Sequence, residues 1–212
     1  MDFKNKKVAI LGFGLEGKDA FKFLEEKGAE ITIFDKKNKE ELDTSGINLK
    51  RASFSLGENY LKDGLNEFDL IVRSPGVYRY IEEIVSAEKN GTLITSPIKI
   101  FFESSPAKII GVTGTKGKGT TTTLIYEILK KAGFKVFLAG NIGKPYLELL
   151  PKLSEKDFVA MEISSFQLID LTISPYISVV LNITVDHLDW HKDREEYIKA
   201  KENIVRYQKE SG

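Results

Sequence analysis

The chain alternates short apolar runs with stretches in which apolar residues recur every three or four positions. Each run is predicted to be a strand, and the runs fall at 8–11, 31–34, 70–72, 92–95, 108–112, 134–138, 158–162 and 176–183. Helical spacing follows several of them, as at Ala20, Phe21 and Leu24 or at Leu124, Ile125, Ile128 and Leu129. This alternation predicts an α/β fold built on parallel sheets.

The last two elements differ in character. The run at 176–183 is nearly continuous, which predicts a parallel strand buried on both faces. The charged segment from Glu195 to Gln208 is predicted to be a helix, and the pattern places Lys201 on its outer surface. Its predicted inward residues are Tyr197, Ile198, Ile204 and Val205.

Composition and linker signals set the domain organisation. Ser104-Ser105-Pro106 resembles a linker, so the predicted domains are residues 1–104 and 105–212, and 212 residues suffice for two small domains. The 31 basic and 31 acidic residues balance, which argues against a nucleic-acid partner. There is no cysteine, no signal-peptide core and no apolar run of membrane-spanning length. The expectation is a soluble cytoplasmic protein with no membrane partner.

A glycine-rich turn lies between the run at 108–112 and the helix that follows it. Glycines let backbone N–H groups approach phosphate oxygens, the helix N-terminus adds a favourable dipole, and Lys118 can reach the terminal phosphates. Two positions depart from the pattern G-x-x-x-x-G-K-[ST], because Val112 replaces a glycine and Gly119 lacks the hydroxyl that normally holds magnesium. Thr120 or Thr121 could supply that hydroxyl. The alternative is a turn that binds nothing.

A second glycine-rich turn follows the first strand. Gly12, Gly14 and Gly17 form a G-x-G-x-x-G pattern, and Asp35 ends the next strand. This βαβ unit predicts a nucleotide site with phosphate at the helix start, although a tight turn that only packs helix on strand is the alternative. Ser74-Pro75-Gly76 also follows a strand, and by itself it is predicted to be structural.

Polar residues follow three later strands. Glu162 ends the run at 158–162, where phosphate-loop enzymes place a magnesium ligand, although a solvent-facing charge is the alternative. Asn141 lies in a turn and is predicted to have a local structural role. His187 follows the run at 176–183, where a ligand contact and a structural role are equally supported, and His191 is expected in solvent or in packing.

Five segments carry a resemblance to a known family. They are Gly111–Lys118, Gly140-Asn141-Ile142-Gly143, Asn182-Ile183-Thr184, Asp186-His187-Leu188-Asp189 and, above all, Glu162-Ile163-Ser164-Ser165-Phe166-Gln167-Leu168. Together these motifs resemble the Mur ligases, ATP-dependent enzymes that add amino acids to peptidoglycan precursors, and in that family Ser-Ser-Phe-Gln marks the members that add D-glutamate. The resemblance covers the whole chain and implies a Rossmann-like parallel-sheet domain followed by part of a P-loop ATPase α/β domain.

The resemblance implies that the first domain binds the UDP of UDP-N-acetylmuramoyl-L-alanine and that the second binds ATP. The implied ATP-binding residues are Gly114, Thr115, Lys116, Gly117, Lys118, Gly119 and Thr120. The implied substrate-binding residues are Gly14, Leu15, Glu16, Asp35, Lys36, Ser74, Pro75, Gly76, Asn141, Ser164, Gln167 and His187. Mg²⁺ would be held by Glu162, His187, Thr120 and Lys201, the lysine as a carbamate, and the catalytic residues would be Lys118, His187 and Lys201.

In the implied reaction, ATP phosphorylates the terminal carboxylate of the substrate, and the amine of D-glutamate then displaces phosphate. Three positions depart from the family pattern, namely Gly119 for a hydroxyl residue, Lys116 for an asparagine and Val185 for an acidic residue. The family also continues beyond the length of this chain. The expectation is a monomeric fragment that binds the UDP-sugar but ligates little or nothing.

Rival interpretations remain open. A nicotinamide-dependent oxidoreductase would use Gly12–Gly17, but it leaves the phosphate loop unexplained. A non-catalytic nucleotide-binding module is favoured by Gly119. A GTPase or small kinase is disfavoured, because no D-x-x-G follows the phosphate loop and no N-K-x-D occurs.

Overall fold

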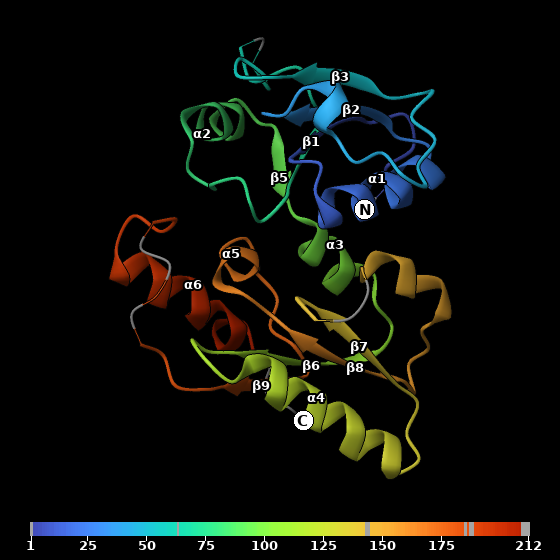
Figure 1. The fold of residues 1–212 in the computed structure, drawn as a ribbon, viewed down its shortest axis with the longest axis vertical. Helices are drawn as coiled ribbons and strands as arrows, with labels where there is room; N and C mark the ends of the chain where they lie inside the picture. Colours follow the sequence, from blue (N-terminus) through green and yellow to red (C-terminus); the bar gives the residue numbers. More distant parts are fainter. Residues whose placement is uncertain (1, 63, 143–144, 185, 187–188, 209–212) are drawn as a thin grey trace. The chain divides into compact units, whose positions relative to one another are not determined.

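The computed structural model describes residues 2–62, 64–142, 145–184, 186 and 189–208 (Figure 1). They form two compact units, Met1–Pro97 and Ile98–Gly212, each with its own parallel sheet, and the predicted α/β fold is confirmed. The division lies earlier in the chain than the predicted boundary at 104–105. The reason is that helix α3 (Pro97–Ser104) packs with the second unit, where Phe101 lies 5.5 Å from Tyr146 between ring centroids.

The first sheet has five strands in the order β3-β2-β1-β4-β5. β1 pairs with both β2 and β4, so the strand order reverses direction at β1. Open parallel sheets bind ligands outside the carboxyl ends of the strands at such a point. The bounds are β1 (Lys7–Leu11), β2 (Glu30–Asp35), β3 (Ser53–Leu56), β4 (Leu70–Arg73) and β5 (Leu93–Thr95).

Helices cover both faces of this sheet. Helix α2 (Glu82–Lys89) buries Ile84 and Ala87 against Ala9 and Leu11 of β1. Successive strand residues point to opposite faces, so the alternate residues of β1 face helix α1 (Leu15–Glu26), which lies across the sheet from α2 (Figure 1). A 3-10 helix, η1 (Lys39–Glu41), follows β2. β3 is absent from the predicted strands, because its two serines interrupt the apolar pattern.

The second sheet has the order β7-β8-β6-β9, with β6 (Lys108–Thr113), β7 (Val136–Gly140), β8 (Phe158–Glu162) and β9 (Ile177–Val180). The prediction of a fully buried strand at 176–183 is wrong. Within the described residues β9 pairs with β6 alone, and Ile177 and Val180 are 44% and 46% exposed. In the described structure this continuous apolar run therefore forms a partly exposed edge of the sheet.

Helices again follow the strands of the second unit. α4 (Lys118–Lys131) follows β6 and packs on β6, β7 and β8, while η2 (Leu147–Lys152) follows β7. α5 (Ser165–Leu168) follows β8, and α6 (Arg194–Arg206) packs against α5 and β6. Tyr197 and Ile204 of α6 are buried as predicted, whereas Val205 is exposed.

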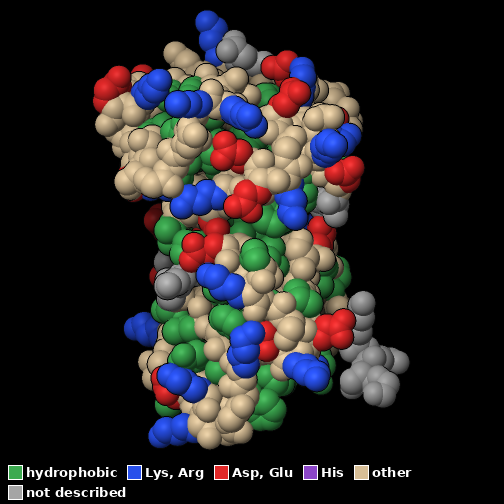
Figure 2. All heavy atoms as spheres, turned by 90° about the vertical axis from the view of Figure 1, so that its right-hand side faces the viewer, with side chains coloured by type: hydrophobic (Ala, Val, Ile, Leu, Met, Phe, Trp, Pro, Cys, Tyr) green, Lys and Arg blue, Asp and Glu red, His purple; other side chains and the backbone are tan. Residues whose placement is uncertain are grey.

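Figure 2 shows Lys and Arg side chains interspersed with Asp and Glu side chains on the face that it draws. This distribution matches the equal numbers of basic and acidic residues in the sequence. Among the described residues, no helix has both the length and the apolar character needed to cross a membrane.

Candidate functional site

The loop between β6 and α4 has a backbone that only glycine adopts freely. Gly114 has φ +151° and Gly117 has φ +84°, and a Cβ on Gly114 would lie 2.7 Å from the Cβ of Leu181. Lys118 is the first residue of α4, and its Nζ donates to the carbonyl oxygens of Gly114 and Thr115, both at 3.0 Å. The loop therefore has the features that a phosphate site requires, namely a preceding strand, glycines with left-handed backbone, a following helix N-terminus and a lysine amine.

Thr115 joins this loop to two distant segments. Its Oγ1 accepts a hydrogen bond from the backbone N–H of Thr184 at 2.9 Å and lies 2.9 Å from the hydroxyl of Tyr197 on α6. Thr115 is buried, whereas its neighbour Lys116 and the helix residue Thr120 are exposed. The side chain of Thr115 therefore holds the loop in place, and Lys116 and Thr120 lie where solvent or a ligand can reach them.

Glu162 ends β8 beside the start of α4. β8 pairs in register with β6 and β7, which places Glu162 opposite Val112 and Gly140. The carboxylate is largely buried, and its Oε2 lies 3.2 Å from the position that a Cβ would take on Gly119. The hydroxyl that the strict motif carries at position 119 would therefore lie next to this carboxylate. Glu162 lies where a carboxylate can hold a cation at the phosphate loop.

Lys201 is buried, although the helical pattern predicts a surface position. It is 2% exposed, and its Nζ donates to the carbonyl oxygen of Gly114 at 3.0 Å and to Oγ1 of Thr113 at 3.3 Å. Burial, and then the positive charge of Lys118, lower the pKa of Lys201 to about 8. The surface prediction is wrong because this position of α6 faces the end of β6. The amine is consequently neutral in a substantial fraction of molecules just above neutral pH.

Ser164 and Gln167 form a capping box at the start of α5. Ser164 Oγ accepts the N–H of Gln167 at 3.3 Å, and Gln167 Oε1 accepts the N–H of Ser164 at 2.9 Å. Gln167 is 1% exposed, so its side chain supports Ser164 rather than facing solvent.

Asn141 is exposed after β7, and its N–H donates to the carbonyl oxygen of Glu162 at 3.2 Å. Both turns therefore fix the ends of strands beside the phosphate loop.

The predicted ligand His187 lies outside the described residues, as does Val185. Across the part of the chain that is described, no three His, Cys, Asp or Glu side chains gather as a metal site. Mg²⁺ is commonly held by one or two carboxylates together with substrate phosphates and water. Glu162, beside the start of the helix that follows the glycine loop, fits that mode of binding and would supply the carboxylate.

In the first unit, three strand-end turns are fixed to one another. Gly12 has φ +83°, and a Cβ on Gly17 would lie 2.1 Å from the carbonyl oxygen of Gly12. Ser74, after β4, donates its hydroxyl to that same carbonyl oxygen at 2.7 Å. Asp35, at the end of β2, accepts the N–H of Phe13 at 2.7 Å. The predicted residues of β1, β2 and β4 are thus brought together at the reversal of strand order.

The start of α1 borders open space. A Cβ on Gly14 would meet no atom within 4 Å, Leu15 beside it is exposed, and Glu16 is half-buried. An acidic residue in the first turn competes with a bound anion for the partial positive charge of the helix. The remaining predicted residues at this edge are Lys36 and Gly76, which are exposed, and Pro75, which is half-buried.

Sequence reasoning missed Arg73, the last residue of β4. Its side chain is fully buried, and its guanidinium donates to the carbonyl oxygens of Ser74, at 3.2 Å, and of Val77. The arginine therefore holds the Ser74–Val77 turn in shape from within. A charged residue directly after the apolar run at 70–72 was the available signal.

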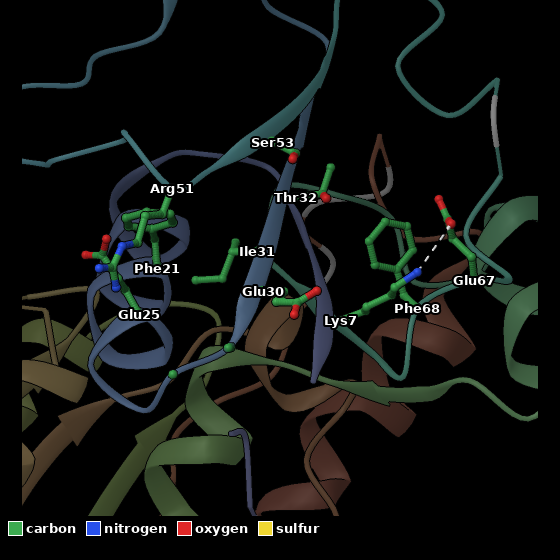
Figure 3. A pocket seen from close by; sticks show the side chains of 12 residues that line it. Lys7, Phe21, Glu25, Glu30, Ile31, Thr32, Arg51, Ser53, Glu67 and Phe68 are labelled. Atoms are coloured by element: carbon green, nitrogen blue, oxygen red, sulfur yellow. Dashed lines mark ion pairs between the residues drawn. The ribbon is translucent and has the colours of Figure 1, made fainter. Parts of the chain in front are cut away.

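The first unit also has a cavity of about 490 Å³, shown in Figure 3. It is lined by residues that begin strands, including Lys7, Glu30 and Ser53, and by Phe21 and Glu25 of α1. The glycine turns lie at the carboxyl ends of the same strands. The cavity is therefore at the opposite edge of the sheet and does not belong to the candidate nucleotide site.

Two family models match the chain. The model described as Mur ligase MurD-like, N-terminal domain matches residues 6–96, and the one described as Mur ligase middle domain matches residues 112–212. Together they account for most of both compact units.

Curated relatives agree with these models. The UDP-N-acetylmuramoylalanine--D-glutamate ligase of Acetivibrio thermocellus is 47% identical over 210 residues, which cover 97% of this chain and 44% of that protein. The protein of the same name from Clostridium acetobutylicum is 47% identical over 208 residues, which cover 97% of this chain and 45% of that protein. The chain thus spans about half the length of the curated relatives that it matches.

Solved structures show the same fold. The UDP-N-acetylmuramate:L-alanyl-gamma-D-glutamyl-meso-diaminopimelate ligase from Neisseria meningitides aligns with a TM-score of 0.58 at 20% identity, over 98% of this chain and 70% of that one. The UDP-N-acetylmuramate-alanine ligase from Thermotoga maritima aligns with a TM-score of 0.53 at 21% identity, over 96% of this chain and 47% of that one. The two domain models, the curated relatives and the shared fold lead to one conclusion: the chain belongs to the Mur ligase family.

Proposed function

We propose that this chain forms the UDP-binding and ATP-binding units of a ligase that joins D-glutamate to UDP-N-acetylmuramoyl-L-alanine. The observation that carries the proposal is the convergence of Lys118 and Lys201 on one carbonyl oxygen, that of Gly114. The helix that follows this loop begins beside the Glu162 carboxylate, which lies 3.2 Å from the position of a Cβ on Gly119. Two amines and a carboxylate at the mouth of a phosphate loop suit the handling of a nucleoside triphosphate. The relatives that carry the name of this reaction support the choice of substrates.

ATP would bind with its phosphates over the loop at 114–119. Lys118 now donates to two backbone carbonyl oxygens, and a phosphate oxygen, which is charged, is a stronger acceptor than either. Mg²⁺ held by Glu162 would neutralise charge on the phosphoryl group during its transfer. Thr120, His187 and a carbamylated Lys201 are the further proposed ligands, and Asn141 and Ser164 are the proposed substrate contacts of this unit.

The reaction would proceed in two steps. The terminal carboxylate of UDP-N-acetylmuramoyl-L-alanine attacks the γ-phosphorus of ATP, and ADP leaves. The amine of D-glutamate then attacks the acyl carbon, and inorganic phosphate leaves as the amide forms. Lys118 would contribute a positive charge next to the phosphoryl group, because it is the first residue of the helix that follows the loop and its amine already lies at the loop.

Lys201 is expected to form a carbamate with CO₂. A neutral amine attacks CO₂ and loses a proton, so the reaction needs the unprotonated side chain. With a pKa of about 8, roughly one tenth of the Lys201 amine is neutral at pH 7 and half at pH 8. In ¹³C-bicarbonate, a carbamate carbon signal should appear by NMR and increase from pH 7 to pH 9.

Lys199 provides the matched control for that experiment. It lies on the same helix but is exposed, and its ion pair with Glu195 raises the pKa of Lys199. The signal should vanish in Lys201→Met and persist in Lys199→Met. A signal that survives in Lys201→Met, or none in the parent chain, would contradict the assignment.

The first unit is expected to bind UDP through the turns around Gly14. Because open space adjoins Gly14 and its φ is −76°, valine can replace it without a backbone clash. The added methyl groups would occupy space intended for ligand, so Gly14→Val should weaken UDP binding about tenfold, or about 1.4 kcal/mol. Isothermal titration of UDP against the parent and the variant checks this, with ATP affinity as the internal control.

Titration with NADH separates this proposal from a nicotinamide enzyme. UDP should saturate the first unit, and NADH should neither bind with similar affinity nor displace UDP. NADH displacing UDP from the Gly14 turn would favour the oxidoreductase instead.

A second candidate, a non-catalytic nucleotide-binding module, is supported by Gly119, which lacks a magnesium-binding hydroxyl. Mg²⁺-independent ATP affinity in the parent chain would favour that module.

The proposed reaction consumes ATP and would take place in the cytoplasm, where ATP is supplied.

We also expect the chain to be a monomer in solution. Size-exclusion chromatography with light scattering measures the mass that tests it.

A further inference from the structure

His191, which was expected either in solvent or in packing, is buried among aromatic rings. It is 2% exposed and stacks on Phe166 at 5.6 Å between ring centroids, with an interplanar angle of 21°. Trp190 and Tyr197 contact the same ring edge to face. A phenylalanine would satisfy this packing equally well, so packing alone gives no reason for an imidazole. The reason lies with the two ring nitrogens.

Each ring nitrogen has a polar partner on a different helix. Nε2 lies 2.9 Å from Oγ of Ser165, which begins α5, and Nδ1 lies 3.1 Å from Oε1 of Glu196 in the first turn of α6. A carboxylate can only accept, whereas a hydroxyl can donate. For a neutral ring, the hydrogen bonds therefore run from the Ser165 hydroxyl to Nε2 and from Nδ1–H to Glu196.

The two helices that His191 joins belong to the two halves of the phosphate site. α5 directly follows the strand that ends in Glu162. α6 carries Tyr197, which reaches Thr115 of the loop, and Lys201, which donates to the loop carbonyl of Gly114. The separation between Glu162 and Lys201 therefore depends on how α6 lies against α5. His191 is a hydrogen-bonded link across that contact.

We propose that His191 is a positioning residue that, through Ser165 and Glu196, sets the place of Lys201 relative to Glu162 at the phosphate loop. The inference rests on the proposed function, because it takes this loop as the ATP site. His191 itself touches no substrate. α6 does not need His191 in order to form, because Asp193 caps the helix by accepting the N–H of Glu196 at 2.8 Å. Loss of the imidazole should therefore displace the helix rather than unfold it.

The first test replaces the ring but keeps its packing. His191→Phe removes the hydrogen bonds of the ring to Ser165 and Glu196. If the displaced helix costs the phosphate loop the equivalent of one hydrogen bond to ATP, ATP binding should be roughly fivefold weaker. The carbamate signal of Lys201 should fall in the same variant, while UDP binding to the first unit should stay within about twofold of the parent. Unchanged ATP affinity and unchanged carbamate in a folded His191→Phe protein would overturn the proposal.

A pair of variants at Glu196 keeps the proposal testable if His191→Phe fails to fold. Glu196→Gln retains an oxygen that can accept from Nδ1–H, whereas Glu196→Ala retains none. ATP affinity and carbamate should be near parental in Glu196→Gln and reduced in Glu196→Ala. Equal losses in both variants would show that the charge of Glu196, and not the link through His191, matters.

Histidine ¹⁵N NMR supplies a signature that simple packing would not give. The parent protein should show the Nδ1–H tautomer of His191, and Glu196→Ala should shift the ring toward Nε2–H. An Nε2–H tautomer in the parent would overturn the assignment. This readout needs no nucleotide, so it still tests the hydrogen-bonded link through His191 if the parent chain binds neither ATP nor UDP and the proposed function fails.

Discussion

Replacement of Lys118 by alanine is expected to weaken ATP binding by about 10- to 150-fold, because a charge-assisted hydrogen bond to phosphate contributes about 1.5–3 kcal/mol. Lys118 starts α4, and its amine already lies at the loop, 3.0 Å from the carbonyl oxygens of Gly114 and Thr115. Little reorganisation is required for it to reach a phosphate bound there. Isothermal titration with ATP and Mg²⁺ measures the loss.

Lys116 is the matched control, because it carries the same charge two positions earlier but is exposed. Lys116→Ala removes a solvated cation and should change ATP affinity by less than about fivefold. The two variants have the same net charge, so a general electrostatic attraction would affect both alike. Equal losses in Lys116→Ala and Lys118→Ala would contradict a specific role for Lys118.

Lys118→Ala should also raise the pKa of Lys201. The charge of Lys118 helps to keep that pKa low, although burial is the larger cause. The pH at which the Lys201 carbamate forms should therefore move upward in the variant. An unchanged pH dependence would show that the two amines do not interact across the Gly114 carbonyl.

Replacement of Gly140 by alanine is expected to reduce the free energy of unfolding of the second unit by about 3–5 kcal/mol. Gly140 ends β7 with φ +92°, and a Cβ there would lie 2.0 Å from the carbonyl oxygen of Glu162. That oxygen belongs to rigid backbone, so β7 and β8 would have to separate. The shift would also displace the Glu162 carboxylate, and ATP affinity should fall with stability.

Gly133 is the matched control at the other end of the same segment. It has φ +85°, but a Cβ there would meet no atom within 4 Å, so Gly133→Ala should cost only the left-handed strain of about 1–2 kcal/mol. Denaturant unfolding can be followed by the fluorescence of Trp190, which is the single tryptophan of the chain and lies in the second unit. Similar losses for both glycines would show that the contact with Glu162 is not the cause.

Much of the fold was predictable from local pattern. Glycine-rich turns after apolar runs marked the ends of β1 and β6, because a parallel strand needs a sharp turn before its helix and only glycine adopts the required backbone. Glu162 was predictable as a candidate for the same reason, since it follows an apolar run directly. These features depend on neighbours in sequence.

Edge position and burial were not predictable in this way. The run at 176–183 was predicted to be a parallel strand buried on both faces, yet in the described structure β9 is a parallel strand at a sheet edge, with Ile177 and Val180 exposed. The place of a strand in a sheet is set by the crossover connections rather than by its own hydrophobicity. Arg73 was missed because it is buried by hydrogen bonds that no hydrophobic pattern records. For His191 the sequence left solvent and packing open, and it gave no sign of the hydrogen bonds at the two ring nitrogens.

The sequence by itself determined the alternation of strands and helices, the two glycine loops and, through Ser164–Gln167, a resemblance to the members that add D-glutamate. The tertiary structure alone decided that Lys201 is buried with a lowered pKa. Its amine donates a hydrogen bond to Oγ1 of Thr113, which is 88 residues earlier in the sequence, because α6 packs against β6. A charge pattern along one helix contains no information about which strand end that helix will cover, and the pKa depends on that strand end.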